Sequence, residues 1–90
     1  MKDLKECRQI INDIDPKMQE LFIKRMHTVR DVALYKQASG MPIFDAKREE
    51  DMLANLSANV EEELRAYYIE FLKAMLAISK EYQKDILGRD

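Results

Sequence analysis

Residues 4–37 read LKECRQIINDIDPKMQELFIKRMHTVRDVALYKQ, and this stretch decides the fold. Its apolar side chains recur at alternating spacings of three and four, which places them on one face of an α-helix. The members of this apolar seam are Leu4, Cys7, Ile11, Ile14, Met18 and Leu21. The periodicity predicts one long N-terminal helix from Leu4 to about Gln37.

Two cations lie where the seam would continue. Arg25 falls on the line of the apolar seam, and a turn of 3.6 residues places Val32 and Lys36 within roughly 20° of Arg25 around the axis. Burial of unpaired cations is costly, so this stripe predicts an anionic partner and a pocket around it. The alternative is that both cations reach solvent or pair with carboxylates of other helices.

The composition is that of a single all-α domain covering residues 1–90. Hydrophobic residues make up 47% and charged residues 36%, with two glycines and two prolines, so helix formers dominate. A helix over residues 4–37 would be about 50 Å long, whereas a compact chain of this size has a radius of gyration of about 12 Å. The apolar seam would be exposed on a monomer, and we therefore expect a homodimer.

Charge and hydropathy argue against several classes of partner. The formal net charge of −2 gives no overall attraction to nucleic acid or to a membrane. The N-terminus MKDLKECR lacks the apolar core of a signal peptide, and no run approaches about 18 apolar residues. We expect a cytoplasmic protein that binds neither nucleic acid nor membrane.

Pro16 disfavours a helix interior, because proline removes a backbone hydrogen bond and clashes with the preceding turn. Asp15 and Pro16 could instead cap and start a separate helix. The seam keeps its phase from Ile14 to Met18 and Leu21, so we predict a continuous helix with a kink at Pro16.

Two further helices follow. The segment SGMP at 39–42 ends the first helix, because glycine suits the C-terminal cap and proline blocks continuation. Asp45 can cap a second helix over residues 46–56. The glutamates at 61–63 suit the first turn of a third helix, which runs to near Leu87 and leaves residues 88–90 to fray.

Polar side chains share faces with apolar ones on both later helices. One face of the second helix carries Asp45, Arg48, Glu49 and Met52. The third helix has one apolar line of Tyr68, Phe71, Met75, Ile78 and Tyr82, and beside it a second line of Leu72, Leu76, Ser79 and Gln83. Ser79 and Gln83 thus lie next to core positions. The simpler interpretation is a capped helix with routine intrahelical pairs, and a polar pair satisfied by backbone or water.

The residue types suggest no Ser/His/Asp or Cys/His set, no metal-ligand spacing and no glycine-rich phosphate loop. Any catalysis would use cations and hydrogen bonds without a nucleophile, a metal or a cofactor. Arg8 lies about 100° from Arg25 around the helix, so the two cannot easily serve one pocket from the same chain. In an intertwined dimer, Arg8 could serve the pocket of the partner.

Several of these residues form an ordered pattern along the chain. In order, they are Leu4-x3-Arg8-x2-Ile11-x2-Ile14-Asp15, Leu21-x3-Arg25, Lys36, Pro42-x2-Asp45-x2-Arg48-Glu49 and Ser79-x3-Gln83. This set, which covers about residues 4–84, resembles the all-α chorismate mutase family. The resemblance implies an intertwined homodimer of three-helix protomers with two sites shared between chains. It also implies the Claisen rearrangement of chorismate to prephenate on the route to phenylalanine and tyrosine.

The resemblance further implies a role for each polar residue. Arg25 and Arg8 of the partner subunit would grip the two carboxylates of chorismate. Arg48 and Ser79 would support that end of the pocket. A pericyclic rearrangement needs no nucleophile, and arginine suits the planar recognition of carboxylates, so the residue types fit the reaction.

By the same resemblance, Lys36 would contact a carboxylate and the ether oxygen of the breaking C–O bond, and Gln83 the same ether oxygen. Glu49, with backbone near Asp45, would hold the ring hydroxyl. Val32 would supply apolar lining between the two cations of the first helix. Two alternatives stay open: an isochorismate-pyruvate lyase of similar fold, and a non-catalytic helical dimerisation module.

Overall fold

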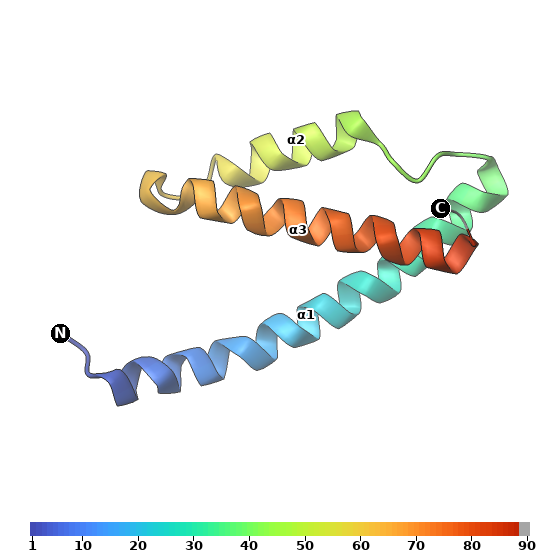
Figure 1. Cartoon of the computed structure of the whole chain (residues 1–90). Helices are drawn as coiled ribbons and strands as arrows, with labels where there is room; N and C mark the ends of the chain where they lie inside the picture. The colour runs from blue at the N-terminus through green and yellow to red at the C-terminus, as the bar shows by residue number, and fades with distance from the viewer. Residues whose placement is uncertain (89–90) are drawn as a thin grey trace.

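The computed structural model describes residues 1–88 and consists of three α-helices joined by short connections (Figure 1). These are α1 (Leu4–Ser39), α2 (Ala46–Ser57) and α3 (Glu62–Leu87). The structure confirms the all-α class and the long N-terminal helix. Of the residues expected to fray, Arg89 and Asp90 lie outside the described residues, whereas Gly88 caps α3 with a φ of 65°.

α1 runs without interruption through Pro16, so the alternative of two separate helices is wrong. The Asp3 carboxylate accepts a hydrogen bond from the Glu6 backbone N–H at 2.8 Å and caps the start of α1. Gly40 ends the helix in the left-handed conformation, with a φ of 68°, as the sequence predicted. The 36 residues of α1 account for the longest dimension of the molecule, 54 Å.

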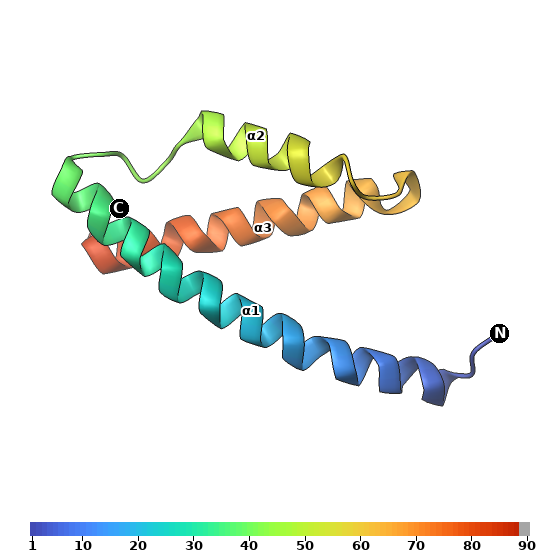
Figure 2. The ribbon, with the colours of Figure 1, turned by 180° about the vertical axis from the view of Figure 1, so that it is seen from behind.

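α3 is the central element, because it packs against both α1 and α2. Only the C-terminal half of α1 lies along α3. The N-terminal half diverges from the other two helices, as the front and back views both show (Figure 2). The Cα radius of gyration is 16.4 Å, well above the value of about 12 Å for a compact chain of this length. The protomer is therefore extended, as a long helix in a small chain requires.

The core of the protomer is very small. Among the described residues, the buried hydrophobic side chains are Ala33, Leu72 and Leu76. The buried line on α3 is the one that also carries Ser79 and Gln83. In the more apolar line beside it, Phe71 is 49% exposed and Ile78 is 50% exposed. Three buried apolar side chains are too few to stabilise a chain of this length by themselves.

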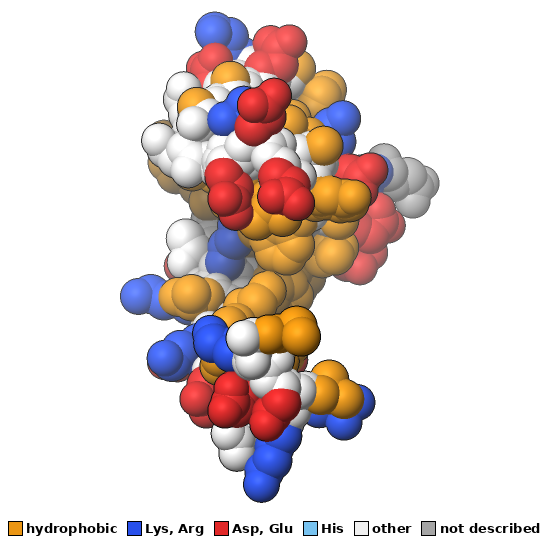
Figure 3. Space-filling view, turned by 90° about the vertical axis from the view of Figure 1, so that its left-hand side faces the viewer, with side chains coloured by type: hydrophobic (Ala, Val, Ile, Leu, Met, Phe, Trp, Pro, Cys, Tyr) orange, Lys and Arg blue, Asp and Glu red, His pale blue; other side chains and the backbone are white. Residues whose placement is uncertain are grey.

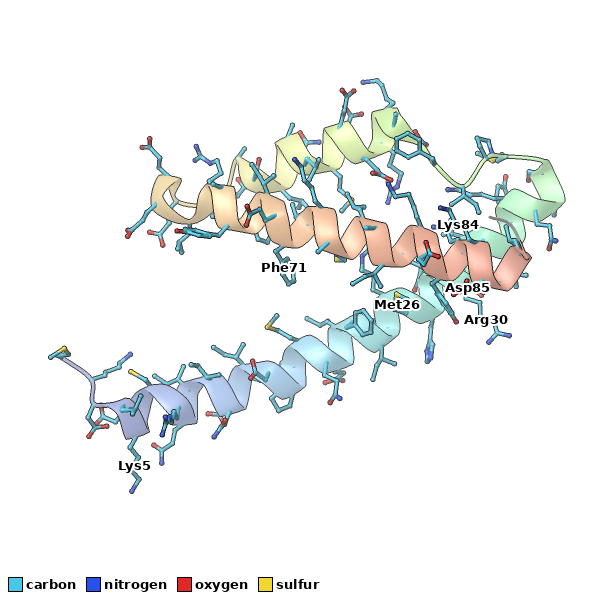
Figure 4. All side chains as sticks on the ribbon, in the orientation of Figure 1. Lys5, Met26, Arg30, Phe71, Lys84 and Asp85 are labelled. Carbon is cyan, nitrogen blue, oxygen red and sulfur yellow. The ribbon has the colours of Figure 1, made fainter. Side chains whose placement is uncertain are left out.

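An apolar groove lies between the diverging half of α1 and α3. It has a volume of about 410 Å³, and its lining is Met18, Leu21, Phe22, Arg25, Phe71, Ala74, Met75 and Ile78. Phe71 points from α3 towards this side (Figure 4). Hydrophobic side chains gather between the part formed by α2 and α3 and the part formed by α1 (Figure 3). No helix within residues 1–88 has the length and apolar character needed to cross a membrane.

Candidate active site

A second, polar cavity of about 100 Å³ lies where the C-terminal half of α1 meets α2 and α3. Eight of the nine candidate site residues line it, and Arg8 is the exception. The eight are Arg25, Val32, Lys36, Asp45, Arg48, Glu49, Ser79 and Gln83. Residues that lie as far as 58 positions apart in the sequence, from Arg25 to Gln83, thus surround one small space.

Arg25 is held in place by α3. Its Nη1 donates a hydrogen bond to Ser79 Oγ at 2.6 Å, and that hydroxyl donates in turn to the Met75 carbonyl oxygen at 2.9 Å. Burial lowers the pKa of Arg25 from its ordinary value, and the nearby charge of Arg48 lowers it further. Arginine still stays protonated at neutral pH, so the cavity contains a desolvated cation beside a second cation. An anion bound there would offset both the burial of the Arg25 charge and its repulsion by Arg48.

Lys36 faces the cavity one turn after Val32, with its amine held by the segment between α1 and α2. Lys36 Nζ donates to the Ile43 carbonyl oxygen at 2.7 Å. A carbonyl is a neutral acceptor, so this contact orients the ammonium group without cancelling its charge. Val32 is 41% exposed in the protomer and adds an apolar side chain between the two cations of α1.

Gln83 brings a buried amide to the cavity. The residue is 6% exposed, and its Oε1 has no hydrogen-bond partner within residues 1–88. A buried polar atom without a partner is costly, which points to a ligand that completes the site. The Gln83 amide offers both an acceptor and a donor, and rotation by half a turn exchanges the two.

The start of α2 supplies the other side of the cavity. Asp45 caps this helix: its Oδ1 accepts the Arg48 backbone N–H at 3.1 Å, as the sequence predicted. The cap directs the first turn of α2, and with it Arg48 and Glu49, towards α3. The Arg48 guanidinium has no ion pair with any described residue, so its charge is available to a ligand.

Lys80 is a lining residue that was not predicted from the sequence. This residue lines the same cavity, and its Nζ lies 3.1 Å from Glu49 Oε1. It lies four positions after Leu76 and three before Gln83, so helical spacing alone would have placed it on the cavity face. The apolar lining also includes Val29, Ile43, Met52 and Leu76. Of these four, the sequence predicted only Met52 and Leu76 to share a helix face with polar candidate residues.

Arg8 lies on the diverging half of α1, where its side chain is exposed. It precedes Arg25 by 17 positions, a rise of about 25 Å along the helix. An arginine side chain cannot span that distance back to the cavity of its own chain.

The arrangement suits the binding of an anion better than acid–base or metal chemistry. Four cationic and two anionic side chains line the cavity, so the lining has a formal net charge of +2. Asp45 caps a helix and Glu49 is ion-paired, so neither carboxylate is a free general base. Across residues 1–88, no group of three or more His, Cys, Asp or Glu side chains is placed to hold a metal ion.

Comparison with known proteins gives one match. The family model described as chorismate mutase type II matches residues 7–84. Searches of curated proteins and of solved structures found no significant match. The matched segment contains every residue that lines the cavity, together with Arg8. The chain therefore belongs to the chorismate mutase type II family.

Proposed function

We propose that the protein is a chorismate mutase, which rearranges chorismate to prephenate on the route to phenylalanine and tyrosine. One observation carries the proposal: cations from α1 and α2 and a buried amide from α3 meet at one cavity whose carboxylates are already engaged. Chorismate is a dianion, and the lining has a balance of two positive charges. We also propose that residues 1–90 act as a single domain.

The reaction sets three tasks that this cavity can perform. The enzyme must hold the compact, chair-like conformer of the substrate, because the two reacting ends of one molecule have to meet. It must stabilise the negative charge that grows on the ether oxygen as the C–O bond breaks. It needs no nucleophile and no proton transfer, because the bonds rearrange in one pericyclic step.

The proposed residue roles are those that the family resemblance implies, and the contacts of each side chain support them. Arg25, held by Ser79 through Nη1, binds one carboxylate through its remaining N–H donors. Lys36 moves its ammonium contact from the Ile43 carbonyl to the substrate, where it meets a carboxylate and the ether oxygen. Gln83, with its amide nitrogen turned inward, donates to the same ether oxygen.

The remaining lining residues complete the binding site. Arg48 adds its unpaired charge at the carboxylate end. Glu49 accepts a hydrogen bond from the ring hydroxyl, supported by backbone near Asp45, whose side chain caps the helix. Val32 packs against the apolar ring edge between the two cations.

The complete site needs a second copy of the chain. The apolar seam of α1 and the partly exposed line of α3 that contains Phe71 and Ile78 flank the apolar groove, and a partner's α1 laid in this groove would bury both. Arg25 stands at the border, because it lines the groove as well as the cavity. A partner helix in the groove can therefore bring Arg8 of the partner subunit to the second carboxylate. We propose an intertwined homodimer with two shared sites.

The test is an assay of purified protein on two substrates, beside a sizing measurement. We expect a dimer that consumes chorismate and forms prephenate. A folded dimer that leaves chorismate unchanged would overturn the proposal. Release of pyruvate from isochorismate without formation of prephenate would reassign the protein as a lyase, because the same cations could serve that reaction.

A further inference from the structure

Lys80 links three parts of the cavity wall. It lies on α3, its Nζ pairs with Glu49 Oε1 of α2 at 3.1 Å, and it lies 4.6 Å from the centroid of the Phe44 ring. Phe44 belongs to the segment between α1 and α2. The Lys80 side chain is 28% exposed and that of Glu49 is 20% exposed, so the pair is partly shielded from water.

The ion pair changes the electrostatics of the cavity. Asp45 is occupied as a helix cap, so Glu49 is the carboxylate of the lining whose charge would otherwise be open to a ligand. An unpaired carboxylate in a partly desolvated space repels an incoming anion. Lys80 Nζ engages Oε1, which leaves Oε2 free to accept a hydrogen bond.

The Phe44 ring restricts where the ammonium group can lie. A cation over an aromatic face is attracted to the ring, most strongly where water is excluded. Lys80 therefore has a favourable contact on the side of Phe44 as well as on the side of Glu49. These two contacts hold the long lysine side chain in one direction, and Glu49 acquires a fixed partner.

We propose that Lys80 is a positioning residue that neutralises Glu49 and orients its free oxygen towards a hydroxyl group of a dianionic substrate. This inference rests on the proposed function only for the identity of that dianion. Lys80 acts through Glu49, so its effect must disappear when the Glu49 charge is removed. A residue that merely held α2 against α3 would keep its effect in that background.

The experiment is a double-mutant cycle on the full chain, with KM and kcat measured for chorismate. Lys80→Met keeps the length of the side chain and removes its charge. We expect KM to rise by about tenfold or more and kcat to change by less than about threefold, because a repelling charge weakens ground state and transition state alike. Lys80→Arg, which preserves the pair and the ring contact, should restore KM to within about threefold of wild type.

The decisive arm compares Lys80→Met in two backgrounds. In Glu49→Gln protein, where no charge needs to be neutralised, adding Lys80→Met should change KM by less than about threefold. An equal rise in KM in both backgrounds would overturn the proposal. A KM of Lys80→Met alone that stays within about twofold of wild type would also overturn it. The matched control is Lys84→Met: Lys84 pairs with Glu81 on the outer part of α3 and does not line the cavity. The KM of the Lys84→Met variant should equal that of wild type.

A second measurement separates this inference from the proposed function. Malate is a dicarboxylate with a hydroxyl group, and succinate lacks that group. In a thermal-shift titration, malate should stabilise wild-type protein more than succinate does, because only malate can donate to Glu49. Lys80→Met should reduce the shift with malate, and the added Glu49→Gln should restore it. These outcomes do not depend on whether the protein converts chorismate. Equal thermal shifts with malate in all variants would contradict the proposed role of Lys80.

Discussion

Arg25 shows how a cation can occupy a helix position that the surrounding pattern makes apolar. Its guanidinium is partly buried, is fixed by the Ser79 hydroxyl and lies near a second cation, so the free protein contains an unfavourable charge arrangement. Such an arrangement is tolerated where a ligand relieves it. We therefore expect activity to depend more strongly on Arg25 than on any other single side chain.

Arg25→Ala should lower kcat/KM for chorismate by at least about a hundredfold, the scale of losing one preorganised charge contact. Arg30→Ala is the matched control, because Arg30 is an exposed arginine of α1 that does not line the cavity (Figure 4). Steady-state kinetics on both variants, with thermal unfolding as a check of the fold, measure the difference. A loss of less than about threefold for Arg25→Ala would remove this residue from the site.

Gln83 supplies a test based on pH. A glutamine does not titrate, so its hydrogen bond to the ether oxygen should persist through neutral pH. In Gln83→Glu the carboxyl group can donate only when it is protonated, and burial favours the protonated form. Activity of that variant should therefore be present in acid and be lost as the pH rises. A pH profile of kcat/KM that is flat between about pH 4 and 8 would contradict the role of Gln83.

At the scale of helices, local signals were enough to locate each element. The Asp45 cap and the Gly40 terminus were predicted because both depend on backbone hydrogen bonds within a few residues. The continuity of α1 through Pro16 followed from the phase of the seam, while the predicted kink stays a prediction. The positions of Arg25 and Lys36 on one stripe were likewise available from helical geometry alone.

What the sequence could not decide was which helix faces meet. The two lines of α3 have the same spacing, and the line buried in the protomer is the more polar one. The line with Phe71 and Ile78 faces the apolar groove instead. Helical spacing is enough to place Lys80 beside Gln83, but it contains no information about the contact of Lys80 with Glu49 of another helix.

The apolar seam of α1 gives a prediction at this scale. Leu21 is 65% exposed in the protomer and lines the groove, so in a dimer its burial should contribute to association. Leu21→Glu would place a charge in that interface twice, once for each chain, and should raise the dimer dissociation constant by at least about a hundredfold. Gln19→Glu adds the same charge at an exposed position of α1 that does not line the groove, and it should leave the dissociation constant within about threefold. Sedimentation at a series of concentrations measures both, and equal dissociation of the two variants would contradict the model of the interface.

Several features of the whole molecule would be explained if two copies of the chain paired. Its core is small, its longest helix diverges from the other two, and the charged cavity lies at one end of an apolar groove that no residue from 1 to 88 fills. Arg8, on the diverging half, is about 25 Å along α1 from the cavity that should need it. A symmetric pair of chains would resolve all of these features together.

Subunit complementation tests that pairing directly. Arg8→Ala and Arg25→Ala should each inactivate both sites of their own homodimer, because every site draws Arg25 from one chain and Arg8 from the other. A heterodimer of the two variants, purified through different tags, contains one site with both arginines intact and one site with neither. By this symmetry its kcat per dimer should be about half that of wild type, with an unchanged KM. A heterodimer no more active than the two parent variants would show that the arginines act within one chain or not at all, and the shared site would have to be abandoned.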